Sequence, residues 1–202
     1  MRPDRTGPIA ALLLAAGSSA RMGRNKLLLR IGGESVIRRA VRRALDADLE
    51  PLVVLGHDAA LVREELAGTP FRAVLNPDWP LGKSASVRAG IAALQPDTAA
   101  AVIVLPDMPL VTAVMLAALA RAYREGTARI VASRYGRVMA PPILYDRTLF
   151  GELSAMEGDG CGKRVVNQHR PEAAVLDWPA EALADLDVPS DYERVHPAHD
   201  PR

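Results

Sequence analysis

The sequence predicts an α/β fold, with an open and mostly parallel sheet whose strands are joined by helices through right-handed crossovers. Two observations carry this prediction. Apolar runs of strand length recur along the chain, and their apolar residues are nearly continuous, as in strands buried on both faces. Segments with helical spacing lie between these runs, and the links between the two kinds of segment are short.

Five expected strands and four expected helices alternate through the first two thirds of the chain. The expected strands are residues 9–16, 51–56, 71–76, 100–106 and 129–133. The expected helices are residues 34–47, 57–68, 84–96 and 112–126. The first helix gathers apolar residues on one face and arginines on the other. Thr112 is a suitable N-cap for the last helix, and Gly68 and Gly126 provide helix stops.

The alternation changes after Ser133, where two prolines interrupt the next apolar run. Pro141 and Pro142 lack the N–H group that a sheet ladder needs, so this segment is not expected to form an ordinary central strand. Further along we expect a loop with a short helix over residues 158–169 and another strand over residues 173–179.

The length of 202 residues suits one domain, and no linker, internal repeat or low-complexity segment divides the chain. We expect a single domain over residues 1–202 with its core at about 9–195. Its last third is expected to form a lid or flank on the sheet, and the segment HPAHDPR (196–202) is expected to fray.

The composition argues against several classes of function. Lys and Arg number 25 against 24 Asp and Glu, so no global field points to nucleic acid or an acidic membrane. The single cysteine, Cys161, excludes a disulfide framework and suits a reducing compartment. The run 9–16 is short and leads into a Gly-rich loop, which favours a strand over an export signal. No stretch is long enough to span a bilayer, and we expect a cytoplasmic protein.

Ligands of such sheets bind at the carboxyl ends of the strands, so the loops at those ends should share one cleft. The first loop reads AAGSSARMGRNK. Its small residues let the backbone approach a bulky anion and can form a phosphate-binding nest. Arg21 and Lys26 add the positive charge that a polyphosphate requires. The Walker and G-x-G-x-x-G patterns are absent. A turn with two solvated cations is the alternative.

Carboxylates follow at two further places. Asp107 ends the strand 100–106 in a turn stiffened by prolines, and a rigid carboxylate facing phosphates suits Mg²⁺, which prefers hard oxygen ligands. The alternative role of Asp107 is a helix or turn cap. Near the C-terminus, Asp185 and Asp187 share one face of an extended segment. They offer a second carboxylate for the same ion or form a plain acidic turn.

A third loop, NPDWPLGKSASVRAG, lies between a strand and a helix. Gly82, Ser84 and Ser86 could contact a base or a phosphate through hydroxyl groups and helix-start N–H groups. Trp79 either covers the cleft or packs in the core.

Taken together, these segments resemble a known family. LLLAAGSSARMGRNKLLL is similar to the L-A-A-G-x-S-x-R-M-G-x-x-K signature of the molybdenum cofactor nucleotidyltransferases, and most of all to their cytidylyltransferase branch. VLGHD, NPDWPLGKSASVRAGI, LPDMPLVT and DLDVPSDYE follow in the family's order and spacing. The resemblance therefore covers residues 9–194.

The resemblance implies a three-layer α/β/α Rossmann-like sandwich of the glycosyltransferase-A type. It implies transfer of CMP from CTP to the terminal phosphate of the molybdenum cofactor, molybdopterin, with release of pyrophosphate. Lys26 and Arg21 would hold the triphosphate, and Asp107 would bind Mg²⁺ with Asp185 or Asp187. The residues expected to contact the nucleotide are Leu14, Ala15, Ala16, Gly17, Ser18, Arg21, Lys26, Gly82, Ser84 and Ser86.

The resemblance favours CTP at one position and leaves the acceptor open. Ala16 stands where guanylyl relatives carry glycine. Residues 140–142 read Ala-Pro-Pro where many relatives carry Gly-His-Pro, and the segment 158–166 departs from the family's acceptor loop. The alternatives are GTP as nucleotide, or a sugar phosphate, polyol phosphate or phospholactate as acceptor. An alternative of another class is a non-catalytic carrier that delivers a cofactor to a molybdenum hydroxylase, a possible partner enzyme.

Overall fold

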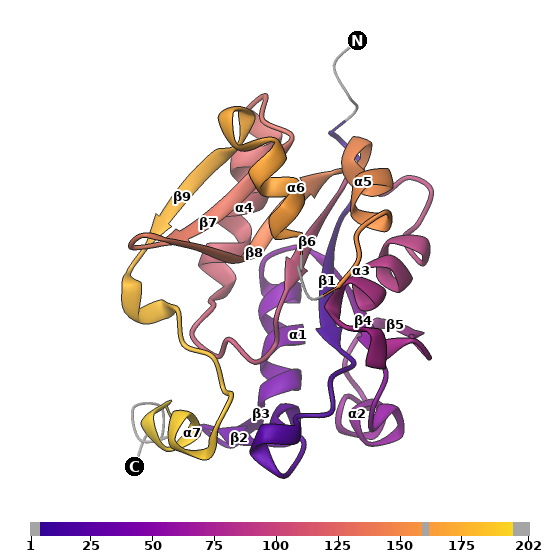
Figure 1. The fold of residues 1–202 in the computed structure, drawn as a ribbon, viewed down its shortest axis with the longest axis vertical. Helices are drawn as coiled ribbons and strands as arrows, with labels where there is room; N and C mark the ends of the chain where they lie inside the picture. The colour runs from indigo at the N-terminus through magenta and orange to yellow at the C-terminus, as the bar shows by residue number, and fades with distance from the viewer. Residues whose placement is uncertain (1–4, 159–161, 196–202) are drawn as a thin grey trace.

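The apolar runs form the strands of one sheet in the computed structural model, which describes residues 5–158 and 162–195 (Figure 1). Within these residues, seven strands lie in the order β5-β4-β1-β6-β8-β7-β9. β1 (Ile9–Ala15) pairs in parallel with β4 (Glu50–Leu55) and with β6 (Ala100–Val104). β5 (Arg72–Leu75) extends this parallel half at one edge. The predicted α/β fold with a mostly parallel sheet is confirmed.

The other half of the sheet contains one reversed strand. β8 (Val138–Asp146) runs antiparallel to β6 and to β7 (Ile130–Tyr135), and β9 (Ala174–Trp178) pairs in parallel with β7. β7 and β9 therefore point the same way as β1. The last third of the chain, expected as a lid or flank, instead extends the sheet, because its apolar segments continue the hydrogen-bonded ladder.

The expectation that the two prolines exclude a central strand is wrong. β8 pairs with β6 only from Ile143 to Asp146, so Pro141 and Pro142 lie beyond that ladder. On the other side, the register with β7 shifts between Ala132 and Arg134, opposite the prolines. The sheet accepts both prolines because neither ladder requires an N–H donor there.

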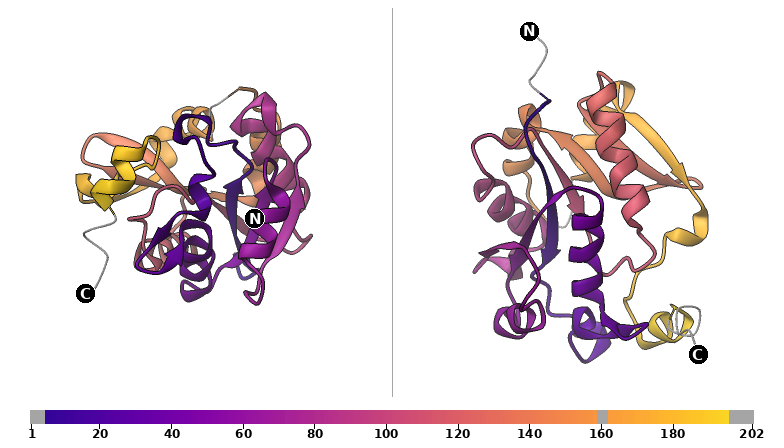
Figure 2. Two further views of the ribbon diagram at one scale, coloured as in Figure 1. Left: turned by 90° about the horizontal axis from the view of Figure 1, so that it is seen from below. Right: turned by 180° about the vertical axis from the view of Figure 1, so that it is seen from behind.

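Helices cover both faces of the sheet, as the two further views show (Figure 2). α1 (Val36–Asp46) and α4 (Ala113–Glu125) pack on one apolar cluster. α3 (Lys83–Ala92), α5 (Phe150–Ser154) and α6 (Lys163–Gln168) cover the other. Alternate residues of a buried strand join opposite clusters, so the expected three-layer sandwich is confirmed.

Two helix starts show how local chemistry sets these boundaries. Thr112 caps α4, as expected, and its side chain accepts a hydrogen bond of 3.2 Å from the N–H of Met115. Ser35 caps α1 in the same way through the N–H of Arg38. α2 (Ala59–Glu65) is shorter than the segment expected for it.

Several small elements, α5 among them, were not expected from the sequence. β2 (Arg30–Ile31) and β3 (Glu34–Ser35) form a two-stranded hairpin, and α7 (Pro189–Val195) follows the acidic segment near the C-terminus. None of the helices in the described ranges has the length and hydrophobicity needed to cross a membrane. The expectations for Cys161 and for the frayed end 196–202 lie outside the described residues.

A buried polar cluster fastens α4 to the reversed strand. The Tyr123 hydroxyl donates to Oδ2 of Asp146 at 2.7 Å, and the N–H and hydroxyl of Thr148 donate to Oδ1 at 2.9 and 2.7 Å. Burial alone would raise the pKa of Asp146, but these hydrogen bonds outweigh it and lower that pKa below its ordinary value. Burial and the carboxylate together raise the pKa of Tyr123.

Candidate active site

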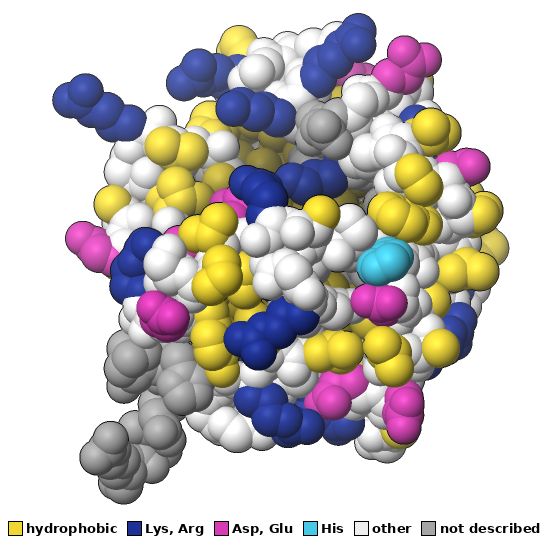
Figure 3. Space-filling view, turned by 60° about the horizontal axis from the view of Figure 1, so that its bottom comes forward, with side chains coloured by type: hydrophobic (Ala, Val, Ile, Leu, Met, Phe, Trp, Pro, Cys, Tyr) yellow, Lys and Arg dark blue, Asp and Glu magenta, His cyan; other side chains and the backbone are white. Residues whose placement is uncertain are grey.

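A cleft of about 360 Å³ opens at the carboxyl ends of β1 and β6. Four segments line it: the loop after β1, the segment before and within the start of α3, the loop after β6, and the segment between β9 and α7. On the face that Figure 3 brings forward, Lys and Arg side chains border a recess. The position follows the rule that open α/β sheets bind ligands beyond the carboxyl ends of their strands.

The loop after β1 is shaped by its small residues. Ser19 adopts a left-handed conformation with φ of 53°, and its hydroxyl accepts the N–H of Lys26 at 3.2 Å. Gly23 also takes a positive φ, 66°, which glycine adopts without strain. A Cβ added to Gly17 would meet no other atom within 4 Å, so this residue borders the open space of the cleft. The backbone of the loop is thus free to face a bulky anion.

A tight contact holds the loop from behind. The N–H of His57 donates to the carbonyl of Ala16 at 3.0 Å. A Cβ on Gly56 would lie 2.7 Å from Cβ of Ala16 and 2.8 Å from Cγ of Trp79, so only glycine permits this packing. Trp79 is half-buried, lines the cleft and contacts the His57 ring at 5.2 Å between centroids. Of the two roles considered for Trp79, it bounds the cleft.

Lys26 lies at the centre of a charged cluster. Its ammonium forms an ion pair with Oδ2 of Asp107 and lies 3.1 Å from Oδ1 of Asp187. Burial alone would lower the pKa of Lys26, but the two carboxylates hold it above its ordinary value. Lys26 is therefore charged and only 16% exposed, whereas Arg21, whose guanidinium lies 3.1 Å from Oδ2 of Asp187, is 72% exposed.

The third carboxylate near this cluster, Asp185, has a raised pKa. Burial, and after it the charges of Asp107 and Asp187, raise the pKa of Asp185, while Lys26 and Lys83 partly offset this effect. The segment that carries Asp185 is joined to the loop after β6, because the N–H of Leu186 donates to the Asp107 carbonyl at 3.0 Å. The cluster thus brings together three carboxylates whose repulsion a cation would relieve.

Most residues expected at the site do line the cleft. They are Leu14, Ala16, Gly17, Ser18, Arg21, Lys26, Gly82, Ser86, Asp107, Asp185 and Asp187. Two do not line it. Ala15 is 1% exposed at the end of β1, and Ser84 is 1% exposed with its N–H bonded to the carbonyl of Gly158 at 3.1 Å. Both support the cleft from behind.

The structure gives specific contacts to two residues that the sequence analysis placed in the site loops without an individual role. Ser19 anchors Lys26, as described above, and its place in the same loop was the available signal. Asn76 is 2% exposed and donates from Nδ2 to the Ser86 hydroxyl oxygen at 3.1 Å. Asn76 is the first residue of the third loop and lies seven residues before Lys83, and neither its type nor its place gave a clear signal for such a contact.

The donor set suits a hard divalent cation. Within residues 5–158 and 162–195, no group of three or more His, Cys, Asp or Glu side chains is already arranged to hold a metal ion. Asp107 and Asp187 nevertheless reach the same cationic group, the Lys26 ammonium. Mg²⁺ commonly takes one or two protein carboxylates and completes its shell with phosphates and water. The carboxylates present fit that requirement.

A cleft of this kind positions phosphates and offsets their charge, and none of the described residues that line it is a His or Cys. Phosphoryl and nucleotidyl transfer depend on positioning and electrostatic stabilisation more than on covalent chemistry. Fold and site together define a nucleotidyltransferase. The chain belongs to the MobA-like NTP transferase domain family, whose model matches residues 11–173.

Three relatives illustrate the breadth of this similarity. The purine catabolism protein PucB of Bacillus subtilis (strain 168) is 30% identical over 206 residues, covering 96% of this chain and 98% of that protein. Nicotine blue oxidoreductase of Paenarthrobacter nicotinovorans is 28% identical, covering 81% and 83%. A probable molybdenum cofactor guanylyltransferase of Opitutus terrae is 32% identical over 124 residues, covering 61% of this chain and 59% of that protein.

Solved structures agree in fold over almost the whole chain. Rv0371c from Mycobacterium tuberculosis H37Rv superposes with a TM-score of 0.84 at 27% identity, covering 95% of this chain and 98% of that one. A second structure of that protein, described as a complex with manganese, gives a TM-score of 0.79 at 26% identity, covering 95% and 99%.

Proposed function

We propose that this nucleotidyltransferase transfers CMP from CTP to the terminal phosphate of the molybdenum cofactor, molybdopterin, and releases pyrophosphate. The observation that carries the proposal is the Lys26 ammonium, shared by Asp107 and Asp187 beside the small-residue loop. This arrangement matches a triphosphate whose charge a lysine and a carboxylate-bound cation would offset.

Three observations support the proposed nucleotide and the proposed acceptor. Ala16 lines the cleft and stands where guanylyl relatives carry glycine, which supports a pyrimidine nucleotide. A molybdenum cofactor guanylyltransferase stands among the relatives, which supports molybdopterin as the acceptor. Lys83, at the start of α3 and on the cleft wall, adds positive charge suited to a phosphorylated acceptor.

The reaction requires one substitution at phosphorus. A terminal phosphate oxygen of the acceptor attacks the α-phosphorus of CTP, the bond to the bridging oxygen breaks, and pyrophosphate leaves with the electron pair. The attacking group is already an anion, so no general base is needed. Lys26 and Arg21 would orient the triphosphate and offset the charge that grows on it in the transition state.

A divalent ion is part of this proposal. Asp107 with Asp187 or Asp185 would hold Mg²⁺, which when bound supplies charge neutralisation for the phosphates. The manganese complex of the mycobacterial relative supports a divalent cation in this family.

The first experiment measures pyrophosphate release with CTP, GTP and ATP in the presence of Mg²⁺, each with and without molybdopterin. We expect release that is selective for CTP and depends on molybdopterin. Release that appears only with a sugar phosphate, polyol phosphate or phospholactate would overturn the acceptor assignment. Cofactor binding without any pyrophosphate release would favour a non-catalytic carrier that serves a molybdenum hydroxylase.

A further inference from the structure

We propose that Asn76 fixes the direction of the Ser86 hydroxyl, so that Ser86 presents a hydrogen-bond donor to an acceptor atom of the nucleotide base. The inference rests on the proposed function in one respect, namely that the cleft binds a nucleotide. Asn76 is a positioning residue in this scheme, because it acts through Ser86 and does not itself line the cleft.

The orientation of the Asn76 amide is determined by its neighbours. Asn76 is 2% exposed, so both ends of its amide need partners inside the protein. The backbone N–H of Asp78 lies 3.0 Å from Oδ1, and an N–H group can only donate. Oδ1 therefore faces Asp78, and the amide nitrogen must face the Ser86 hydroxyl oxygen at 3.1 Å.

This contact decides what Ser86 can offer to a ligand. The hydroxyl oxygen receives the Asn76 N–H, so its own proton has to point elsewhere. A serine inside a helix often donates to the carbonyl four residues earlier, but within the described residues no protein acceptor takes the Ser86 proton. Ser86 lines the cleft although it is only 5% exposed, so the proton is available to a bound ligand.

The surroundings of Ser86 indicate which part of a nucleotide lies against it. The charged cluster of Lys26, Asp107 and Asp187 marks the phosphate end of the cleft. Ser86 is joined through Asn76 to the segment that continues into Trp79, and Trp79 packs near Ala16 behind Gly56. An aromatic ring and a methyl group suit a base rather than a phosphate.

A single substitution should reverse the polarity of this contact. Asn76→Asp keeps the shape of the side chain and the bond from the Asp78 N–H but offers Ser86 only acceptors. The Ser86 proton would then turn toward residue 76, and the base acceptor would face an oxygen lone pair. A lost and unsatisfied hydrogen bond of this kind corresponds to about tenfold or more in affinity.

The test compares kcat and KM for the nucleotide in Asn76→Asp, Ser86→Ala and the double variant. We expect KM to rise about tenfold in each single variant with kcat changed less than about threefold. The double variant should be no worse than Ser86→Ala alone, because Asn76 acts only through the hydroxyl. Asn167→Asp, an exposed change on α6, is the matched control and should leave KM unchanged.

Three outcomes would overturn the proposal. One is a KM that stays within twofold of wild type in Asn76→Asp, and another is an Asn76→Asp effect that persists in full in the Ser86→Ala background. If the buried carboxylate prevents folding, the neutral variant Asn76→Ala replaces Asn76→Asp. We then expect a smaller rise in KM, and no further rise when Asn76→Ala is added to Ser86→Ala. The third outcome is an effect of Asn76→Ala on KM that persists in the Ser86→Ala background. The cycle is run with whichever nucleotide the enzyme turns over, so a failure of the CTP assignment is recognised separately.

Discussion

Two aspartates at the carboxyl ends of neighbouring strands have different roles. Asp107 follows β6 and lies in the cleft, where it shares Lys26 with Asp187. Asp146 ends β8, which runs antiparallel to β6. It therefore lies beside the start of β6, at the end of the sheet opposite the cleft. There it is fully buried and bonded to Tyr123 and Thr148. The direction of a strand thus decides whether the polar residue at its end serves the ligand or the fold.

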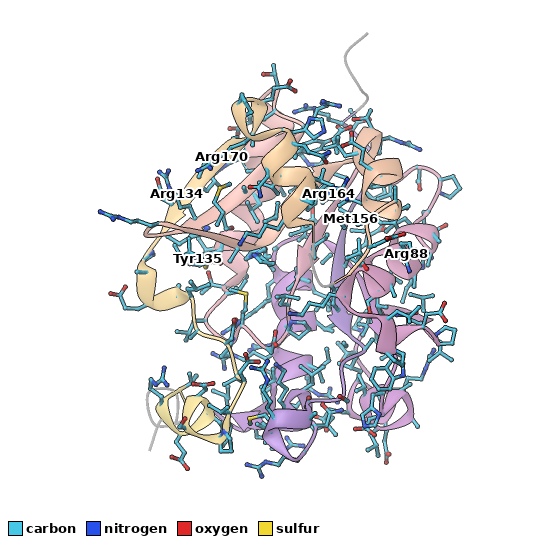
Figure 4. The ribbon with its side chains drawn as sticks, viewed as in Figure 1. Arg88, Arg134, Tyr135, Met156, Arg164 and Arg170 are labelled. Carbon is cyan, nitrogen blue, oxygen red and sulfur yellow. The ribbon has the colours of Figure 1, made fainter. Side chains whose placement is uncertain are left out.

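The same contrast extends to the two halves of the sheet. The parallel half supplies the loops that line the cleft. Among the described residues, the half with β8 contributes the segment after β9 that carries Asp185 and Asp187. Figure 4 labels Arg134 on β7 and Arg164 on α6 in that second half, and neither is among the residues that line the cleft. Arg134 is instead paired with Asp177 of the neighbouring β9.

The largest effect is expected at Asp107. Asp107→Ala should lower Mg²⁺-dependent pyrophosphate release by about a thousandfold or more, because a lost metal contact removes several kcal/mol of charge stabilisation. Thermal unfolding should change little, since Asp107 is at the surface of the cleft. Wild-type-like turnover in this variant would refute the metal assignment. Asp107 and Asp146 would then no longer differ in their role in catalysis.

The second-largest effect on turnover is expected at Lys26. Lys26→Ala should reduce kcat by about 10²- to 10³-fold, the usual cost of removing one preorganised group that stabilises developing charge. Steady-state pyrophosphate release measures it. Arg121→Ala, which removes an exposed cation on α4 away from the residues that line the cleft, is the control and should retain wild-type kcat. An unchanged rate in Lys26→Ala would mean that the loop after β1 does not hold phosphates.

At Asp146, a change is expected to affect the stability of the fold and not the rate of catalysis. Tyr123→Phe leaves a buried carboxylate short of one donor and should lower the free energy of unfolding by about 1–3 kcal/mol. Urea denaturation measures this loss. Turnover per folded molecule should stay within about twofold of wild type. If Tyr123→Phe had normal stability but reduced turnover, Asp146 would take part in catalysis, and the contrast between Asp107 and Asp146 would be wrong.

The smallest expected effect is a dependence of stability on pH. Hydrogen bonds hold the pKa of Asp146 below its ordinary value in the folded protein, so the unfolded chain binds a proton first as the pH falls. The stability contributed by Asp146 is therefore full above the unfolded pKa, near 4, and is lost as the pH drops through the folded pKa. Denaturation between about pH 3 and pH 6 should show a shallower acid loss in Asp146→Asn than in wild type.

The sequence predicted the parallel part of this molecule well because buried parallel strands are continuous apolar runs and their loops lie together by topology. It therefore located Gly17, Lys26 and Asp107 at one cleft. It did not predict β8, because a proline pair argues against a central strand unless both ladders are known to stop short of it. Strand direction is a property of the whole sheet and has no local signal.

The hydrogen bonds between side chains were harder to predict than the strands. The Asn76 and Ser86 pair joins residues ten positions apart from a strand end and a helix, and neither residue type marks such a partner. The same holds for Tyr123 and Asp146, which only the folded sheet brings together. Spacing along the chain can assign a residue to a loop or a face, but the direction of a hydrogen bond depends on the surrounding atoms.

The sharing of Lys26 has a consequence for the order in which substrates arrive. A nucleotide that came alone would have to draw the ammonium away from Asp107 and Asp187, and it would leave two anionic groups facing its own phosphates. A nucleotide that arrives together with a divalent cation meets no such conflict, because the cation can take over the carboxylates as the lysine turns to the triphosphate. On the proposed function, the cleft would therefore admit the pair more readily than a bare polyanion.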